Sequence, residues 1–458
     1  MSQIKGPKHI PLLGWRYRGL QMLRDPMGFF TNLHNKYGEF CFWDPKNSKH
    51  LCVFGPEMNK YVFSRPDIFI VDAFRESRLP RNSAIERLSF GLMRLNGDVH
   101  ARHRKLMQPA FRSTVVNTYW QSVVDETNRE LSNWQFGQTR DINKDLIRLI
   151  TNISLKTMFG VDEIENNARL QKLMEELLIL ATSPLSLLVP YAIPGFPYYK
   201  MLKIADEIEL IIKKMIQNKI GKAGNDVLSI LVNSQSEDGG LSENELISEA
   251  YTVLCHESVA ATMSWLLIML DRHPEIYEKI TNELATLNGS PLPVENIKEL
   301  KYLDNVVKES VRLLPPSGFS LRYLSKDHEF YGVKLKKGTM VFLSSYVTHR
   351  YSNVFDNPLQ FSPDRWETIQ PSPYEYLPFG CGMHSCIGKY FAQMEIKVIL
   401  SIILQKYKLS IKPGAVIDRG MRVSMVPKHG LPMTLNRLTD KIKRENISGN
   451  IFESIELI

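Results

Sequence analysis

Apolar residues recur roughly every three to four positions through most of the chain, a spacing typical of amphipathic helices. It predicts helices at residues 27–37, 98–108, 115–134, 141–158, 164–182, 198–220, 242–272, 274–287, 301–314 and 388–405. Short apolar runs bordered by Gly or Pro predict strands at residues 39–44, 49–54, 319–324, 339–344 and 432–436. The pattern therefore predicts a mainly α architecture of the α+β class, with small sheets that lie mostly near the two ends of the sequence.

One predicted helix is unusually long. No Gly or Pro interrupts residues 242–272, and about thirty helical residues would extend for about 45 Å, enough to cross a whole domain. His256, Glu257 and Ser258 stand in its middle among apolar neighbours. A charge buried there would need a partner or a chemical task. The alternative is an amphipathic helix with Glu257 facing solvent.

The composition is that of a globular protein with a large core. The 458 residues are 43% hydrophobic and 23% charged, which excludes wholesale disorder, collagen-like repeats and a polytopic membrane protein. The formal charge of +8 is spread along the chain, and its densest basic cluster, at residues 100–105, is short. We therefore expect no nucleic-acid partner. The five cysteines are scattered, as in proteins of reducing compartments.

The length would allow about three domains, but no repeat or low-complexity linker divides the chain. We expect one folded unit. No apolar run near the N-terminus is long enough for a signal peptide or an anchor, and four prolines interrupt the uncharged stretch 177–198. These features predict a soluble cytoplasmic protein without a membrane anchor.

The segment before the predicted helix 388–405 carries the clearest chemical signal. Its sequence is Phe379-Gly-Cys-Gly-Met-His-Ser-Cys386-Ile-Gly388. The free N–H groups and dipole of a helix start stabilise a thiolate and would lower the pKa of Cys386, and glycines let the backbone turn tightly against a flat ligand. This suits a thiolate ligand of haem iron. The alternatives are an inert cysteine and a zinc site of Cys381, His384 and Cys386, which lacks the usual fourth ligand.

This stretch resembles the haem-binding loop of the cytochrome P450 family, F-G-x-G-x-R-x-C-x-G, with His384 in place of the usual Arg. The resemblance extends from about Pro7 to Leu435. It implies a helix-rich P450 fold with haem b between the long central helix and the helix after the cysteine loop. It also implies a haem-thiolate domain at residues 1–437 and a C-terminal extension, 438–458, which we expect to be a mobile tail. Cys386 would ligate the iron, and the loop residues against the haem would be Phe379, Gly380, His384 and Gly388.

Glu309-Ser-Val-Arg312 resembles the E-x-x-R helix motif of the family, and Arg365, in Phe361-Ser-Pro-Asp-Arg365-Trp, resembles its third member. A spacing of three places Glu309 and Arg312 on one helix face, although such pairs are also common on solvated surfaces. The resemblance implies a buried structural network beside the haem loop. Removal of one charge would leave the others without partners.

Basic residues are expected around the haem carboxylates. His100 and Arg104 are four residues apart, so they share a helix face, and they resemble the propionate-binding pair of the family. Arg322 and His384 occupy the positions of two further basic partners. Four basic groups would match two carboxylates. Solvated surface charge is the alternative, and we keep it for Arg102 and Lys105.

The middle of the long helix, Leu254-Cys-His-Glu-Ser-Val, resembles the oxygen-activation motif A-G-x-[DE]-T-T. The resemblance implies that Glu257 and Ser258 are catalytic and deliver protons. Ser258 replaces the usual Thr but keeps a hydroxyl able to donate and accept. Cys255 replaces the usual Gly, and we expect it to narrow or reshape the oxygen-binding groove.

The resemblance implies a haem-thiolate monooxygenase that uses dioxygen to hydroxylate or epoxidise a lipophilic small molecule. The matched motifs leave no room for a fused reductase, so a ferredoxin or flavodoxin with its reductase would supply electrons to a monomeric enzyme. Basic residues could steer an acidic donor, with ordinary solubilising charge as the alternative: Arg102, Lys105, Lys389 and Lys397. Other outcomes on the same fold are oxidative coupling, rearrangement, peroxide-driven oxidation and non-catalytic gas binding by the haem.

By family analogy the substrate pocket is formed by residues 74–95, the apolar stretch 177–198, residues 317–321 with Ser317 and Phe319, residues 426–430, and Leu254 and Glu257. The Leu, Ile, Phe and Tyr in these segments favour a lipophile. Stretch 177–198 could alternatively rest transiently on a membrane surface.

Overall fold

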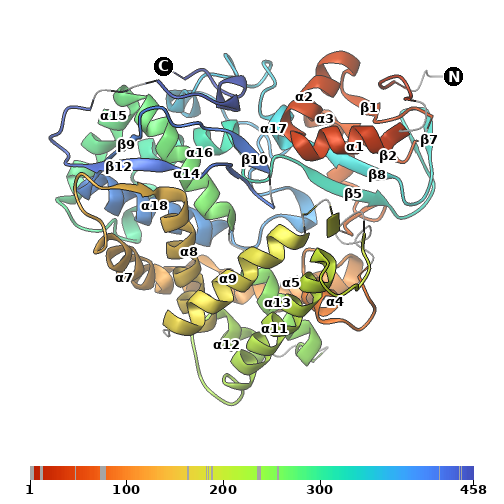
Figure 1. The fold of residues 1–458 in the computed structure, drawn as a ribbon, viewed down its shortest axis with the longest axis horizontal. Coiled ribbons are helices and arrows are strands. Elements are labelled where there is room, and N and C mark those ends of the chain that lie inside the picture. The colour runs from red at the N-terminus through yellow and green to blue at the C-terminus, as the bar shows by residue number, and fades with distance from the viewer. Residues whose placement is uncertain are drawn as a thin grey trace.

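The computed structural model describes residues 5–10, 14–46, 48–72, 79–161, 164–181, 183, 185–186, 189–234, 239–254, 257–421, 423–442, 444 and 446–457. A large helical body occupies most of the molecule, and a sheet-rich lobe lies at one corner (Figure 1). The mainly α architecture with small sheets is therefore confirmed.

The sheet-rich lobe joins two segments that are distant in sequence. Its five strands follow the order β1-β2-β8-β5-β3, in which β2 and β8 are parallel and the other pairs antiparallel. The strands are β1 (Phe40–Phe42), β2 (His50–Val53), β3 (Phe69–Ile70), β5 (Ser320–Leu324) and β8 (Met340–Leu343). Four of them were predicted. Phe42, Leu51 and Val341 are buried in the core of this lobe.

The helical body is organised around α14 (Glu257–Arg272), which packs against α8 (Ile142–Phe159), α16 (Lys301–Leu313) and α18 (Lys389–Lys406). Every side chain from Val259 to Asp271 is buried. The predicted long helix is observed as α13 (Glu243–Leu254) followed by α14, and residues 255–256 lie outside the described part of the chain.

One helical stretch among the described residues, 243–272, is long and apolar enough to cross a membrane. Because 81% of its most apolar window is buried inside the protein, its apolar character is explained by its place in the core.

The other predicted helices are observed with small shifts at their ends. The predicted helix 115–134 is broken into α6, a short 3-10 turn and α7. The other helices are α1 (Gly14–Arg24), α2 (Pro26–Tyr37), α3 (Pro56–Phe63), α4 (Ala84–Leu88), α5 (Gly97–Met107), α6 (Ser113–Val116), α7 (Trp120–Leu131), α9 (Ile164–Ala181), α11 (Pro197–Gln217), α12 (Val227–Val232), α15 (Pro274–Leu284) and α17 (Ser345–Thr348). Of these, α1, α3, α4, α12 and α17 were not predicted.

Three small sheets complete the fold. Strand β12 is confirmed where the sequence predicted it, and the other strands of these sheets are too short to show alternation in the sequence. The sheets are β4 (Thr139–Asp141), β12 (Pro432–Asn436) and β9 (Lys408–Ile411); β6 (His328–Phe330) and β7 (Val333–Leu335); and β10 (Arg419–Met421) and β11 (Met425–Pro427).

The end of the chain packs onto the protein. Ile451 and Ile455 are buried, Ser448 forms a bridge with Val416, and Arg419 of β10 donates a 2.9 Å hydrogen bond to Glu453. Residues 446–457 thus make apolar and polar contacts with the rest of the protein, and the mobility expected of the extension 438–458 stays a prediction. The division of the chain at residue 437 stays a prediction.

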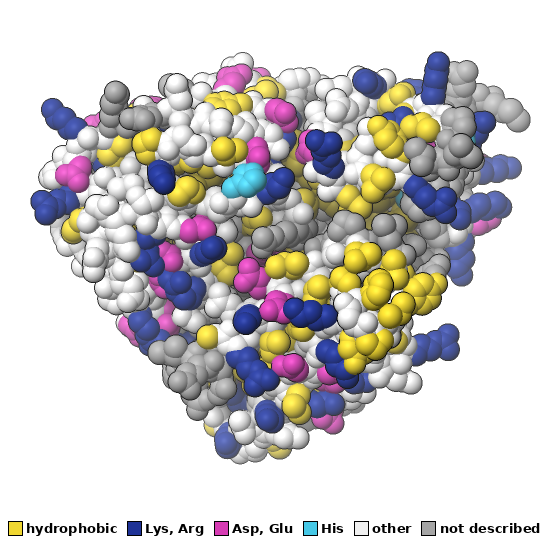
Figure 2. Space-filling view, viewed as in Figure 1, with side chains coloured by type: hydrophobic (Ala, Val, Ile, Leu, Met, Phe, Trp, Pro, Cys, Tyr) yellow, Lys and Arg dark blue, Asp and Glu magenta, His cyan; other side chains and the backbone are white. Residues whose placement is uncertain are grey.

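Charged side chains are mixed over the face shown in Figure 2, where Lys and Arg lie among Asp and Glu without forming a stripe. Apolar side chains also reach the surface. Within stretch 177–198, Tyr191, Ile193 and Phe196 are exposed.

Candidate haem site

Helix α5 carries two of the predicted basic residues, His100 and Arg104. His100 is 1% exposed, and both its ring nitrogens are buried without a hydrogen-bond partner among the described residues. Its ring lies 4.2 Å from that of His384, centroid to centroid. Arg104 donates to the carbonyl oxygen of Ser385 at 2.8 Å and to its hydroxyl at 3.3 Å. The structure therefore brings α5 against the cysteine loop.

Arg322 joins this group from strand β5. Its guanidinium donates to the backbone oxygen of Leu321 at 2.9 Å and lies over the ring of Phe63. Burial lowers the pKa of Arg322 to about 10. Burial, then the positive charge of His100, Arg322 and Arg104, lowers the pKa of His384 to about 3. The four predicted basic residues thus lie close enough to oppose one another's charge.

The structure shows no ion pair that balances this group within the described ranges. Among the residues that the structure describes, none of the four forms an ion pair. Buried cationic groups without counter-charge are costly, and the two ring nitrogens of His100 lack partners. A ligand with two carboxylates would satisfy both requirements, so these residues fit the haem that the sequence implies.

The cysteine loop has the backbone that its glycines allow. Gly380 and Gly382 adopt left-handed φ values of 68° and 72°, which residues with a side chain rarely adopt. The turn closes with a 2.8 Å hydrogen bond from the Cys386 N–H to the oxygen of Phe379, and Gly388 caps the start of α18. The thiol of Cys386 therefore lies at the end of a tight turn and ahead of a helix.

The pKa of Cys386 corrects one expectation. Cys386 is exposed as a whole residue, but the protein packed around its sulfur raises the pKa of the thiol through burial, against the opposing effects of the Gly388 N–H and the Arg104 charge. The helix start was expected to lower this pKa, and burial outweighs it. Coordination to a metal would deprotonate the thiol directly.

The zinc alternative is not supported. No group of three or more His, Cys, Asp or Glu side chains within the described ranges could hold a metal ion. Cys381 is half-buried, and burial raises the pKa of its thiol.

The proposed proton-delivery residues begin helix α14. Glu257 and Ser258 are both half-buried in its first turn, and the backbone oxygen of Ser258 accepts a 2.8 Å hydrogen bond from Thr262. Cys255, whose effect on the groove was predicted, lies outside the described residues. The catalytic roles of Glu257 and Ser258 stay predictions.

Of the predicted pocket residues, Leu254 is half-buried against the main core and Ser317 is exposed. Phe319 packs with its ring 5.3 Å from that of Phe30. Phe319 is therefore also part of the aromatic packing under the sheet-rich lobe. The pocket roles of Leu254, Ser317 and Phe319 stay predictions.

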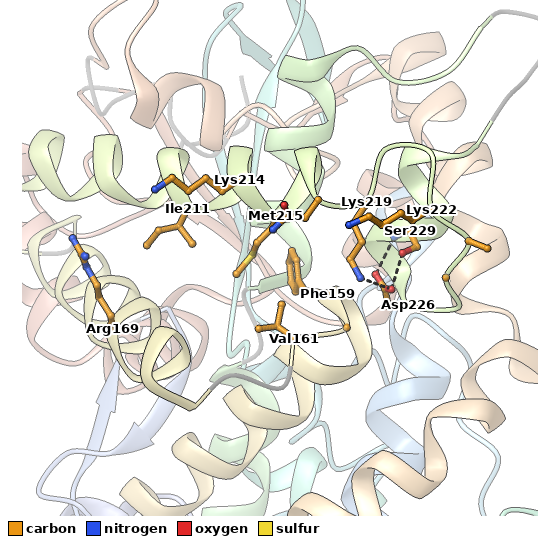
Figure 3. A pocket seen from close by; sticks show the side chains of 14 residues that line it. Phe159, Val161, Arg169, Ile211, Lys214, Met215, Lys219, Lys222, Asp226 and Ser229 are labelled. Atoms are coloured by element: carbon orange, nitrogen blue, oxygen red, sulfur yellow. Dashed lines mark hydrogen bonds and ion pairs between the residues drawn. The ribbon is translucent and has the colours of Figure 1, made fainter.

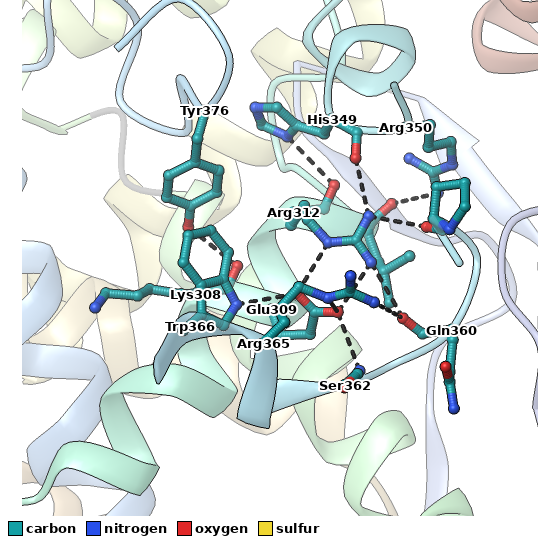
Figure 4. A network of polar contacts seen from close by, with 12 residues as sticks. Lys308, Glu309, Arg312, His349, Arg350, Gln360, Ser362, Arg365, Trp366 and Tyr376 are labelled. Atoms are coloured by element: carbon teal, nitrogen blue, oxygen red, sulfur yellow. Dashed lines mark hydrogen bonds and ion pairs between the residues drawn. The ribbon is translucent and has the colours of Figure 1, made fainter. Parts of the chain in front are cut away.

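The predicted charge network is formed and buried (Figure 4). Glu309 and Arg312 are completely buried and share two hydrogen bonds of 2.9 Å. Arg365 donates to Glu309 at 2.9 Å. The Ser362 N–H and the Trp366 indole N–H also donate to the Glu309 carboxylate, each at 3.0 Å. The sequence did not identify these last two, although both lie next to or near Arg365.

The basic residues considered for partner docking do not form one face. Lys397 is buried and pairs with Asp304, which corrects its assignment to a docking surface. Arg102 is held by Glu245 at 2.8 Å and by the backbone oxygen of Gly240 at 2.7 Å. Lys105 and Lys389 are exposed.

Two cavities lie away from this site. One, of about 620 Å³, is bordered by the ends of α8 and α11 and the start of α12 (Figure 3), and Lys219 and Asp226 pair at its edge. The other, of about 630 Å³, borders α1 and α2. Neither contains a residue of the basic group or of the cysteine loop.

Comparisons with known proteins agree with this geometry. The family model described as Cytochrome P450 matches residues 4–433. The cyclooctat-9-en-7-ol 5-monooxygenase of Streptomyces melanosporofaciens is 26% identical over 426 residues, 90% of each chain. The pentalenene oxygenase of Streptomyces avermitilis is 26% identical over 423 residues, covering 89% of this chain and 92% of the relative.

The overall structure is also similar to a solved one. The retinoic acid-bound cyanobacterial CYP120A1 superposes with a TM-score of 0.82 at 23% identity, covering 94% of this chain and 99% of that one. This likeness confirms the fold expected from the sequence.

Proposed function

This chain belongs to the cytochrome P450 family, and from that premise we propose that it hydroxylates or epoxidises a lipophilic small molecule with electrons from a separate protein. Membership makes it a P450-type monooxygenase with haem b as cofactor. The observation that carries the proposal is the group of His100, Arg104, Arg322 and His384, which are buried or half-buried and form no ion pair with an acid in the described part of the chain.

The proposed haem site assigns each residue a separate task. The Cys386 sulfur is the iron ligand, and Phe379, Gly380 and Gly388 shape the loop around it. The side chains of His100, Arg104, Arg322 and His384, which we call the cradle, donate to the two haem carboxylates. Haem, when bound, supplies the activation of dioxygen, which a thiolate ligand favours. Arg104 has a double role, because it also donates to Ser385 and so connects the cradle to the loop that carries the ligand.

Proton delivery is assigned to the first turn of α14. The Glu257 carboxyl takes up and releases protons, and the Ser258 hydroxyl, which both donates and accepts, passes them on. Ser258 lacks the methyl group that restricts a Thr rotamer, so its hydroxyl is less firmly oriented. We therefore propose that more reducing equivalents are lost without product in this chain than in the Ser258→Thr variant.

We propose an unsaturated cyclic or polycyclic terpene-type lipophile as substrate. Two relatives are named for reactions of cyclooctat-9-en-7-ol and pentalenene, and the apolar segments assigned to the pocket favour such a molecule. Leu254, Ser317 and Phe319 would contact it. Oxidative coupling, rearrangement, peroxide-driven oxidation and gas binding are the alternatives.

The proposed electron donor is a ferredoxin or flavodoxin served by its own reductase. Exposed Lys105 and Lys389 could attract an acidic donor, and such an attraction would weaken with added salt. We further propose a monomer that works in the cytoplasm without an anchor.

Thiolate ligation is tested by the carbon monoxide difference spectrum of the reduced protein. We expect a thiolate-type spectrum that disappears in Cys386→Ser and persists in Cys381→Ser, a matched control in the same loop. Loss in both variants, or in neither, would contradict the assignment.

The reaction is tested by turnover of a lipophile panel with surrogate redox partners, read by mass spectrometry. A product heavier by one oxygen atom supports monooxygenation. A product lighter by two hydrogens would instead indicate oxidative coupling or desaturation. No turnover with any electron donor would favour gas binding by the haem.

A further inference from the structure

A second histidine of α5, His103, is buried in a charge network that the haem site does not use. Its side chain is 1% exposed. Its Nδ1 lies 2.7 Å from Glu249 Oε1, and its Nε2 lies 3.0 Å from Glu245 Oε1. Both carboxylates belong to α13 and are four residues apart, so they share a helix face. One ring thus connects α5 to α13 through both nitrogens.

The contacts fix the charge of His103. A neutral imidazole has one N–H, and each nitrogen here faces a carboxylate oxygen, so both bonds require the imidazolium form. The Glu249 side chain is completely buried, and its other oxygen accepts the Leu92 N–H at 3.2 Å. With Arg102 donating to Glu245, two cations balance two anions. Loss of the His103 proton would break one of its two hydrogen bonds and leave the two carboxylates with one balancing cation, Arg102.

The protonation equilibrium agrees with this geometry. Burial lowers the pKa of His103, but the hydrogen bonds and charges of Glu249 and Glu245 outweigh burial, so the pKa is raised above its ordinary value. The neighbouring segment contributes the N–H of Ser242, which donates to the other oxygen of Glu245 at 2.7 Å. On α5 itself, burial and then the charges of Arg104 and His103 lower the pKa of His100.

Helix α5 is consequently held on two sides. His103 binds α13, and the adjacent Arg104 binds Ser385 of the cysteine loop. The backbone at Gly91 also packs closely against α13. A Cβ at this position would come within 2.2 Å of Thr252 Oγ1 and 2.8 Å of the backbone oxygen of Ser248. A shift of α5 would therefore move His100 and Arg104 relative to the loop.

We propose that His103 is a positioning residue for the cofactor: as an imidazolium held by Glu249 and Glu245, it fixes α5 so that His100 and Arg104 stay at the haem carboxylates. This inference rests on the proposed cradle role of His100 and Arg104. His103 itself touches neither haem nor substrate. It makes haem retention depend on pH.

The sign of that dependence follows from the raised pKa. A histidine whose folded-state pKa exceeds its unfolded value contributes its full stabilisation below the unfolded pKa, about 6.5, and loses it as pH rises through the folded pKa. Haem loss should therefore accelerate as the solution becomes more alkaline than that folded pKa.

The test measures the rate of haem transfer from the holoprotein to excess apomyoglobin between about pH 6 and pH 10. We expect the wild-type rate to rise by about tenfold or more over this range, because a buried charged pair is being broken. His103→Gln should lose haem about tenfold faster than wild type at pH 6 and show little further rise. His9→Gln is the matched control, because His9 also lies 2.7 Å from a carboxylate, that of Asp44, and it should keep the wild-type profile.

Two further measurements separate the possible failures. If Arg104→Gln does not accelerate haem transfer, the cradle assignment fails. If Arg104→Gln accelerates it while His103→Gln matches wild type at every pH, the positioning role of His103 is overturned. If His103→Gln does not fold, the test uses amide hydrogen exchange of α5 in the wild-type protein. After correction for intrinsic exchange rates, the α5 amides should be less protected at high pH than at low pH. Unchanged protection would overturn the inference.

Discussion

Replacing Glu309 with Gln tests how strongly the buried charge network stabilises the fold. Five donors converge on the Glu309 carboxylate (Figure 4). Three reach Oε1, from Arg312, Arg365 and Ser362, and two reach Oε2, from Arg312 and Trp366. Whichever oxygen the amide nitrogen replaces, at least two of these donors lose their acceptor. The variant also leaves the guanidinium of Arg312, which is 0% exposed, without its counter-charge.

The expected loss is about 3 kcal/mol in the free energy of unfolding. Breaking a buried ion pair by neutralising one partner costs about 3–5 kcal/mol. The lower end applies here, because Arg312 also donates to the backbone oxygens of His349, Pro358 and Gln360, and these bonds survive the substitution.

The assay is urea unfolding of the holoprotein, followed by far-UV circular dichroism and by haem absorbance. Asp364→Asn is the matched control, since it makes the same carboxylate-to-amide change next to Arg365. Asp364 pairs with Lys279 at 2.9 Å, and both side chains are more than half exposed. Because solvent screens this pair, Asp364→Asn should change the free energy of unfolding by a few tenths of a kcal/mol at most. A Glu309→Gln loss below about 1 kcal/mol, or equal to the control, would refute the reasoning.

Three other predictions follow from single contacts. Ser258→Ala should lower the product formed per electron consumed, whereas Ser258→Thr should exceed wild type; equal yields in all three proteins would remove Ser258 from proton delivery. Burial, then the charges of Arg312 and Arg350, lowers the pKa of His349 to about 3, so below about pH 6.5 the unfolded chain takes up a proton that the folded one does not. Wild type should lose up to about 1.4 kcal/mol more per pH unit than His349→Gln, measured as unfolding free energy between pH 6.5 and 5, and parallel slopes would contradict this. Ile451→Ala should cost about 2–4 kcal/mol in urea unfolding because the side chain is fully buried, and a neutral result would mean that the chain end contributes nothing.

The sequence predicted most of the helices because an apolar face buried against a core repeats with the helix period. The resemblance to family motifs implied the Glu309 network and the basic group. Spacing along the chain added only that Glu309 and Arg312, and likewise His100 and Arg104, share a helix face. The short strands, such as β6 and β10, have three residues each, too few for alternation to be visible.

Other features depend on contacts between distant segments, which periodicity does not encode. Lys397 is basic in the sequence, but it pairs with Asp304 of α16 and its side chain is buried. Cys386 precedes a helix, yet burial by the rest of the protein decides its pKa. His103 looked like one more charge in a basic cluster, and only the approach of α13 shows that it is enclosed by two carboxylates.

The packed chain end restricts how this protein can be joined to another. Segment 446–457 is held through Ile451, Ile455 and the bond between Arg419 and Glu453. A reductase fused directly after residue 437 would delete that segment and uncover the apolar surface beneath it. A single-chain, self-sufficient version should therefore keep every residue through 457 and attach the reductase through a flexible linker beyond it.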